Sequence, residues 1–145
     1  MPNPIPEGYH TVTPYLTVAN VATLMEFLTN AFGATERGKI AGPDGRIAHA
    51  EMLIGNSIVM MGQPEKAEDI RRTMLHLYVP DVDAAYQRCL AAGAVSVREP
   101  TNQFYGDRAG SEKDPTGNDW YIATHVEDVS REEMERRMKT QQAGA

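Results

Sequence analysis

The sequence predicts an α+β fold built from two βαβββ modules in tandem, followed by a C-terminal helix. An internal repeat is the first sign: YLTVANVATLMEFLTNAFGA (15–34) and HLYVPDVDAAYQRCLAAGA (76–94) share one pattern. Each has an alternating run, a polar cap residue, a helix-period segment and a Gly-Ala stop. The second sign is that short strands divided by hairpin turns follow each helix. Two copies are too few for a solenoid, so we expect a duplicated module within one domain spanning residues 1–145.

Length and composition are typical of a single globular domain. The chain has 145 residues, of which 41% are hydrophobic and 23% charged. The 14 Lys+Arg and 20 Asp+Glu residues give a net charge of −6, which argues against nucleic acid or an anionic membrane as partner. One cysteine, Cys89, excludes an intrachain disulfide framework. We see no signal peptide and no apolar stretch of about 20 residues, so a cytoplasmic location is expected.

The predicted helices carry start and stop signals in both modules. Apolar residues recur at helical spacing after Asn20 in the first module and after Asp81 in the second. Both polar residues can cap a helix start, and Gly33 and Gly93 can take the left-handed conformation that ends one. Cys89 falls on the apolar stripe of the second helix, so we interpret it as a buried residue.

Turn motifs complete the modules, which we place at about residues 9–65 and 72–128. Residues 42–45 (GPDG) and 114–117 (DPTG) suit tight turns, and Gly55-Asn56 suits a two-residue hairpin with a positive φ at the glycine. Ser130 and Glu133 have the spacing of a capping box, which predicts a charged helix over about 130–140.

Strand alternation indicates which side chains face away from the helices. Val12, Leu16 and Val18 are expected to face the helices, which places Tyr15 on the opposite side. For the last strand, either Tyr121 or its neighbour Trp120 takes the open side. The residues predicted on the helix-free face are Tyr15, His49, Glu51, Met74, His76 and Tyr121. Such a mixture suits a small-molecule pocket, and a half-solvated sheet face is the alternative interpretation.

These features resemble the vicinal oxygen chelate superfamily, which includes glyoxalase I, bleomycin-resistance proteins and extradiol dioxygenases, and in particular its PhnB-like branch. The residues that carry the resemblance are PYLTV (14–18), LHLYV (75–79), HAEMLIGNS (49–57) and YGDRAGSEKDPTGNDWYIATHVEDVS (105–130). It covers roughly residues 9–130. The resemblance implies a mixed sheet curled around a cavity, and a homodimer that in some relatives exchanges modules so that each cavity draws on two chains.

Metal-dependent members bind a divalent ion through the first and last strand of each module. Carried over by position, those places fall on Thr13, Val59, Met74 and Tyr121, and a shift along the fourth strand offers only Met60 or Met61. Zn²⁺ prefers imidazole, thiolate or carboxylate, and Mg²⁺ or Mn²⁺ prefers oxygen. We therefore predict no metal at the inherited site and no other cofactor. Tyr121 would fill the metal's space, or would simply plug a closed core.

Two functions follow from the sequence. In the first, a metal-free pocket sequesters a planar or amphipathic small molecule, as resistance members of the superfamily do. The residues expected to bind it are Thr13, Tyr15, Met60, Met74, Phe104, Tyr105, Arg108, Trp120 and Tyr121. For Arg108, an ion pair that braces the hairpin is the favoured alternative.

In the second function, His49, Glu51 and His76 act as an acid–base set in an isomerase or lyase reaction. The same three residues would form an atypical metal site if they converge. A structural hydrogen bond between His49 and Glu51 is an equally good interpretation of that pair.

Overall fold

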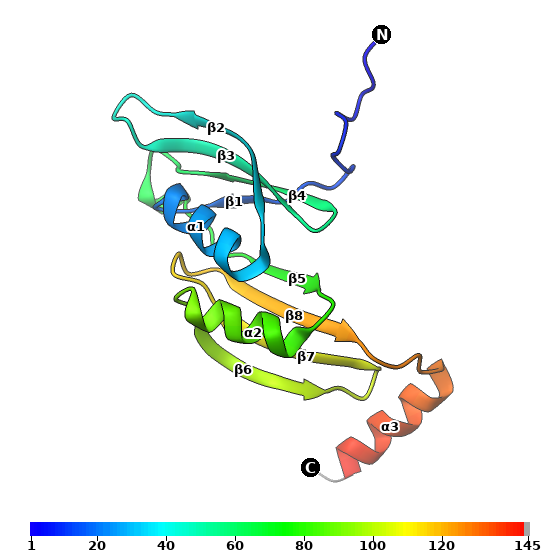
Figure 1. Ribbon diagram of the computed structural model, residues 1–145. Coiled ribbons are helices and arrows are strands. Elements are labelled where there is room, and N and C mark those ends of the chain that lie inside the picture. The colour runs from blue at the N-terminus through cyan, green and yellow to red at the C-terminus, as the bar shows by residue number, and fades with distance from the viewer. Residues whose placement is uncertain (144–145) are drawn as a thin grey trace.

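The computed structural model describes residues 1–143 and confirms the tandem βαβββ fold (Figure 1). The first module consists of β1 (Tyr15–Thr17), α1 (Val21–Phe32), β2 (Thr35–Ala41), β3 (Ile47–Ile54) and β4 (Ser57–Gly62). The second consists of β5 (Met74–Tyr78), α2 (Val82–Ala91), β6 (Val95–Asn102), β7 (Asp107–Lys113) and β8 (Asp119–His125). A short 3₁₀ turn, Ala67–Asp69, lies between the modules, and α3 (Arg131–Ala143) ends the described chain. None of the helices in residues 1–143 has the length and apolarity needed to cross a membrane.

Each module forms its own four-stranded mixed sheet, and the two sheets have equivalent topology. The strand orders are β1-β4-β3-β2 and β5-β8-β7-β6. Tyr15 pairs with Met60 in the first sheet as His76 pairs with Tyr121 in the second. A residue of β1 therefore corresponds to the residue 61 positions later in β5, and a residue of β4 to the one 61 positions later in β8.

One hydrophobic core joins the two modules. It lies between the helices and the helix-covered faces of the sheets and takes in residues of both modules, such as Leu16, Met52 and Ile122. Trp120 of β8 is fully buried, and its ring lies 5.4 Å from Phe32 and 6.4 Å from Phe27, both in α1. Trp120 of the second module therefore packs on the helix of the first, and the two modules share this core.

The caps that the sequence predicts are present. The Asn20 side chain accepts a hydrogen bond from Thr23 N at 3.1 Å, and the Asp81 side chain does the same from Ala84 N. Gly33 ends α1 with a φ of 66°, a conformation in which only glycine avoids a steric cost. Ser130 caps α3 as expected, although the helix extends beyond residue 140 to Ala143.

The side of the sheet that each strand residue faces agrees with the sequence prediction, with two differences. Val12 was expected to face the helices, but β1 begins only at Tyr15 and Val12 is 82% exposed. On β4, Val59 and Met61 face the core, and Met60 takes the open side. For β8, the structure decides between the two alternatives: Trp120 faces the core and Tyr121 the open side.

The Asp114–Gly117 turn fixes this phase of β8. Asp114 is buried, and its Oδ1 accepts hydrogen bonds from the backbone N–H and the hydroxyl of Thr116, each 2.6 Å long. Its Oδ2 accepts the indole N–H of Trp120, also at 2.6 Å. One carboxylate thus shapes the turn and at the same time satisfies the buried polar atom of Trp120.

A second buried carboxylate has no such partners. Glu112 on β7 is fully buried, and neither of its oxygens has a hydrogen-bond partner. Burial raises the pKa of Glu112 to about 7, and the neighbouring Cys89 thiol only partly opposes this. Cys89 is itself buried, as the sequence predicts, and burial raises the pKa of its thiol.

Replacing Asp114 with Ala is expected to lower the free energy of unfolding by about 2–4 kcal/mol, because the indole N–H of Trp120 is left buried and unpaired. Urea unfolding followed by the fluorescence of Trp120 measures this. Pro115→Ala, in the exposed part of the same turn, is the control and should cost less than about 1 kcal/mol. Equal effects of the two substitutions would contradict the role of Asp114.

Glu112 makes stability fall as pH rises. Its pKa is 4.5 in an unfolded chain and about 7 in the fold, so the native state binds the extra proton across this interval. The free energy of unfolding should therefore decline by about 3 kcal/mol between pH 4.5 and 7 from this group and level off above it. Urea unfolding of Glu112→Gln should show this decline removed, whereas Glu26→Gln on the exposed side of α1 keeps it. An unchanged pH slope in Glu112→Gln would show that Glu112 is not the group responsible.

Candidate functional site

The open side of the first sheet carries a chain of hydrogen-bonded polar side chains. We call Tyr15, His49, Glu51 and Met60 the first-module face. The Tyr15 hydroxyl lies 3.2 Å from His49 Nδ1, and His49 Nε2 lies 3.3 Å from Glu51 Oε2. The Tyr9 hydroxyl donates to the other oxygen of Glu51. The hydrogen bond from Tyr9 lowers the pKa of Glu51 most, and the hydrogen bond with His49 lowers it further. The carboxyl group is therefore ionised at neutral pH.

The segment before β1 covers part of this face. A cavity of about 500 Å³ lies between residues 4–13 and the sheet, with Glu51 and Met60 on its sheet side. Thr13 lines the cavity, but its hydroxyl donates to the carbonyl of His10. Tyr9 had no distinctive sequence signal as a site residue, because its partner Glu51 lies 42 residues away in the chain.

The open side of the second sheet carries a row of aromatic rings. We call Met74, His76, Tyr78 and Tyr121 the second-module face. The ring of His76 lies 5.1 Å from that of Tyr121, nearly parallel to it, and 4.9 Å from that of Tyr78. Tyr105, in the loop before β7, is next to Tyr121. Burial, followed by this contact with Tyr121, raises the pKa of Tyr105 to about 12.

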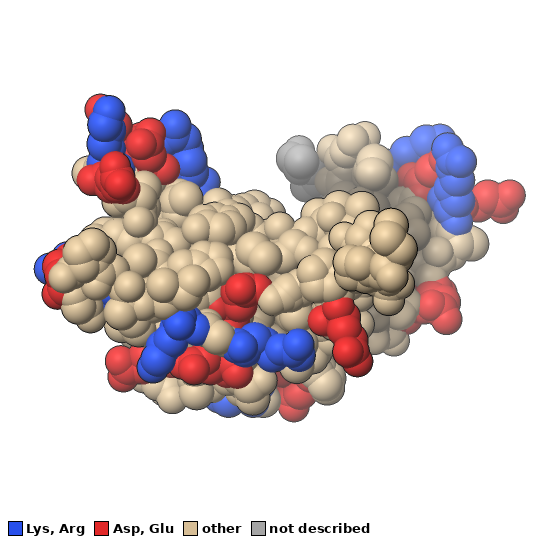
Figure 2. All heavy atoms as spheres, turned by 90° about the horizontal axis from the view of Figure 1, so that it is seen from above, with Lys and Arg blue, Asp and Glu red and all other residues tan. Residues whose placement is uncertain are grey.

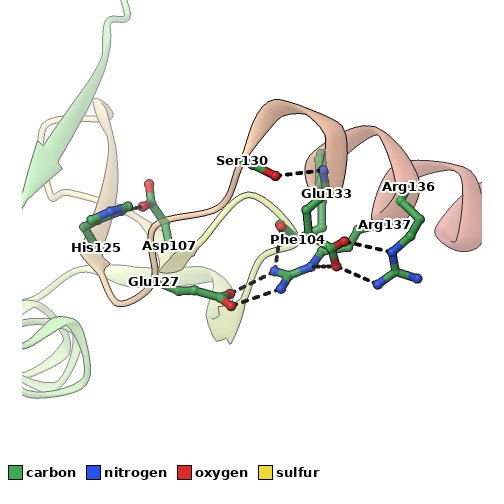
Figure 3. Close-up of polar contacts among 8 residues, drawn as sticks. All are labelled: Phe104, Asp107, His125, Glu127, Ser130, Glu133, Arg136 and Arg137. Atoms are coloured by element: carbon green, nitrogen blue, oxygen red, sulfur yellow. Dashed lines mark hydrogen bonds and ion pairs between the residues drawn. The ribbon is translucent and has the colours of Figure 1, made fainter.

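A buried aspartate supports the end of this row. Asp107 accepts hydrogen bonds from the Tyr78 hydroxyl and from His125 Nδ1, each at 2.8 Å. His125 Nε2 lies 2.7 Å from Asp128, and Figure 3 shows His125 beside Asp107. Hydrogen bonds with Asp128 and then Asp107 raise the pKa of His125. Asp107 and Tyr78 were not among the predicted site residues, although Tyr78 shares the alternation of Met74 and His76.

A second cavity, of about 660 Å³, runs along β5. His76 and Tyr78 border it, and Phe32, Ile54 and Leu77 are among the apolar residues that line it. It lies between the β3–β4 hairpin of one module and the outer strand of the other. The row of rings thus adjoins a space large enough for a small ligand.

Two of the predicted binding residues lie on the helix-covered side of the second sheet and not on its open face. Trp120 was predicted to bind a ligand, but it is fully buried against α1, so this prediction is wrong. Arg108 donates to both oxygens of Asp83 at 2.9 and 3.0 Å, so it forms an ion pair as the favoured alternative expected, but the pair joins β7 to α2 and does not brace the hairpin. Its guanidinium group is therefore already engaged.

The loop containing Phe104 lies against α3 (Figure 3). The ring of Phe104 packs edge-on against Tyr105 at 5.2 Å, while its carbonyl accepts from Arg137. Arg137 also pairs with Glu127 and Glu133, which holds α3 beside the loop. Gly106 has a φ of 102°, and a Cβ there would collide with the Glu127 carbonyl, so this position requires glycine.

His49, Glu51 and His76 do not form one group within the chain. His49 and Glu51 lie on β3, whereas His76 lies on β5 of the other sheet, among aromatic rings. Within residues 1–143 no three His, Cys, Asp or Glu side chains are placed to hold a metal ion. The three-residue acid–base or metal set is therefore wrong for a single chain, and the His49–Glu51 contact remains.

The inherited metal positions offer a poor set of donors. The offset of 61 residues shows that Met60, not the buried Val59, corresponds to Tyr121. The four positions therefore carry Thr13, Met60, Met74 and Tyr121, which give two thioethers, a hydroxyl and a phenol. This set does not fit Zn²⁺, Mg²⁺ or Mn²⁺.

The protein therefore consists of two βαβββ modules, each with a four-stranded sheet that has one open face. The candidate site lies on the strands of these open faces. Residues 9–122 match the model of the Glyoxalase/Bleomycin resistance protein/Dioxygenase superfamily, and the chain belongs to that family. The uncharacterized protein Mb0911c of Mycobacterium bovis is 35% identical over 144 residues, covering 92% of this chain and 95% of the relative.

Solved structures show the same fold. TioX from Micromonospora sp. ML1 has 23% identity and a TM-score of 0.69, covering 81% of this chain and 99% of TioX. A glyoxalase/bleomycin resistance protein/dioxygenase from Nocardioides has 17% identity and a TM-score of 0.62, covering 84% and 87%. At these identities the similarity shows a shared fold alone.

Proposed function

We propose that this protein is a small-molecule-binding member of its family, of the PhnB-like branch, that sequesters its ligand without the family's metal ion. The observation that carries the proposal is the composition of the open sheet faces. Large side chains such as Tyr15, Met74 and Tyr78 are 51–66% exposed there, and the inherited metal positions lack suitable donors. We expect this protein to act in the cytoplasm.

The chemistry of the faces supports binding of planar or amphipathic molecules. Aromatic rings bury a large area and stack on other rings, while methionine adapts to irregular shapes. Seen from above, charged side chains gather toward the margins of the molecule, and a broad band of uncharged residues lies between them (Figure 2).

A homodimer is part of the proposal. Tyr15 and Ile40 on the open side of the first sheet, and Met74, Tyr78 and Val95 on that of the second, are large exposed apolar residues. β1 and β5 are each at the edge of a sheet. We infer that the first-module face of one chain covers the second-module face of another and encloses the ligand between them.

Acid–base chemistry at His49 is the second candidate function. The chain of contacts from Tyr15 through His49 to Glu51 resembles the base-and-orienter pairs of proton-transfer enzymes. It would support exchange of a proton next to a carbonyl. Solvent deuterium exchange into a 2-oxo acid that disappears in His49→Ala would favour this function over sequestration.

Ligand binding is tested by thermal shift over aromatic drugs, thiol adducts and 2-oxo acids. A ligand at a hundred times its Kd should stabilise the fold by about 2.7 kcal/mol. Tyr15→Ala should lower the stabilisation, because it removes a ring from the first-module face, whereas Val126→Ala at an exposed position after β8 should not. No shift with any member of the panel would contradict the proposal.

The dimer is tested by light scattering. The chain has a mass of 16.0 kDa, and we expect twice this mass in solution. Ile40→Asp should shift the protein toward the monomer, because it places a charge in the inferred interface. Glu36→Gln, on the same strand, is the control. A monomeric mass for the unmodified protein would contradict the inferred interface.

A further inference from the structure

The second-module face has the features of a site for a positively charged group. Its aromatic row consists of Tyr78, His76 and Tyr121, with His76 4.9 Å from the ring of Tyr78 and 5.1 Å from that of Tyr121. Aromatic faces attract cations through their quadrupoles, by about 0.5–2 kcal/mol for each well-placed ring. Tyr78 and Tyr121, one on each side of His76, are rings of this kind, and two such rings hold a cation more strongly than one.

The charges behind the row favour a cation as well. Asp107 and Asp128 both bond to His125, so even a protonated imidazole leaves this group with a net negative charge. The hydrogen bond to Asp107 raises the pKa of Tyr78, and burial raises that of Tyr105, so both rings remain neutral phenols. The net charge of −6 attracts cations over a longer range.

In the described chain, the charge of Asp107 and Asp128 is paired with His125 but with no lysine or arginine. Within residues 1–143 the bonds of the Asp107 side chain come from Tyr78 and His125, and no lysine or arginine is bonded to it. The adjacent Arg108 is tied to Asp83, and Arg72 is tied to Asp119 at the opposite end of the strand. The Tyr78 end of the row therefore remains open to a positive group from outside.

The cavity along β5 gives the rest of the ligand a place. His76 and Tyr78 border it, and apolar residues such as Phe32 and Ile54 line it. Arg88 also borders this cavity, from α2 on the helix-covered side, where its Nε donates to the Ala31 carbonyl. This arrangement favours an apolar body in the cavity with the cationic group over the rings.

We propose that the aromatic row of Tyr78, His76 and Tyr121, backed by Asp107, selects apolar ligands that carry a quaternary ammonium or protonated amine. This inference rests on the proposed small-molecule binding and names the class of ligand.

The test uses three probes that share a phenyl ring and differ in charge. Phenyltrimethylammonium, tert-butylbenzene of nearly the same shape, and benzenesulfonate are titrated into the ¹⁵N-labelled full chain, and amide shifts are followed. The cation should bind about tenfold more tightly than the neutral probe, and benzenesulfonate should bind most weakly.

Two pairs of variants test which residues cause the preference for the cationic probe. Asp107→Asn should reduce the preference for the cation, whereas Asp44→Asn, in an exposed turn, changes the net charge equally and should leave it unchanged. Tyr121→Leu should also reduce it, while Tyr121→Phe keeps the ring and should retain it. The second pair keeps the test valid if Asp107→Asn does not fold.

Equal affinity for the cation and the neutral probe would overturn the ligand class while leaving small-molecule binding intact. Retention of the full preference in Tyr121→Leu would overturn the assignment to this row of rings. Failure of all three probes to bind would contradict the ligand class and the proposed function together.

Discussion

The hydrogen bond from the indole of Trp120 to buried Asp114 fixes which side chains of β8 face the core and which face the open side of the second sheet. It ties the first residues of β8 to the turn that precedes them, so the strand enters the sheet with Trp120 toward α1. Because side chains alternate along a strand, Tyr121 must then lie on the opposite side. The position that metal-dependent relatives use for a ligand thereby becomes part of an aromatic surface.

The two modules reach similar open faces by different chemistry. In the first, hydrogen bonds join Tyr15, His49 and Glu51 into a polar chain. In the second, ring contacts join His76 to Tyr78 and Tyr121, and a buried aspartate anchors one end. A ligand enclosed between two such faces would contact ionisable groups on one side and aromatic rings on the other. The duplicated backbone thus supports two complementary walls.

Local sequence signals predicted the fold well because each of them acts over a few residues. Asn20, Asp81 and Gly33 take the cap conformations expected of them, and the turn glycines Gly45, Gly55 and Gly117 all have positive φ. The prediction matched Val59 to Tyr121, which is one residue out of register with the observed match of Met60. The first module turns with two residues between Ile54 and Ser57, whereas the second turns over a longer loop between Lys113 and Asp119.

The site was harder to predict because it depends on contacts between distant segments. Alternation alone allowed either Trp120 or Tyr121 on the open face; the prediction of Tyr121 was right, and packing of Trp120 against α1 of the other module decides it. Asp107 meets Tyr78 across 29 residues, and Tyr9 meets Glu51 across 42. The three-residue site required His76 to converge with His49 and Glu51, but a shared strand phase does not place residues on one sheet, and β3 and β5 belong to different sheets.

The central claim is that side chains on the open faces have replaced a metal ion as the means of holding a ligand. Elemental analysis of protein purified without chelators tests it most directly. The account predicts Zn, Ni, Mn and Fe contents far below one ion per chain. One ion per chain, lost when Met60, Met74 or Tyr121 is replaced, would contradict it.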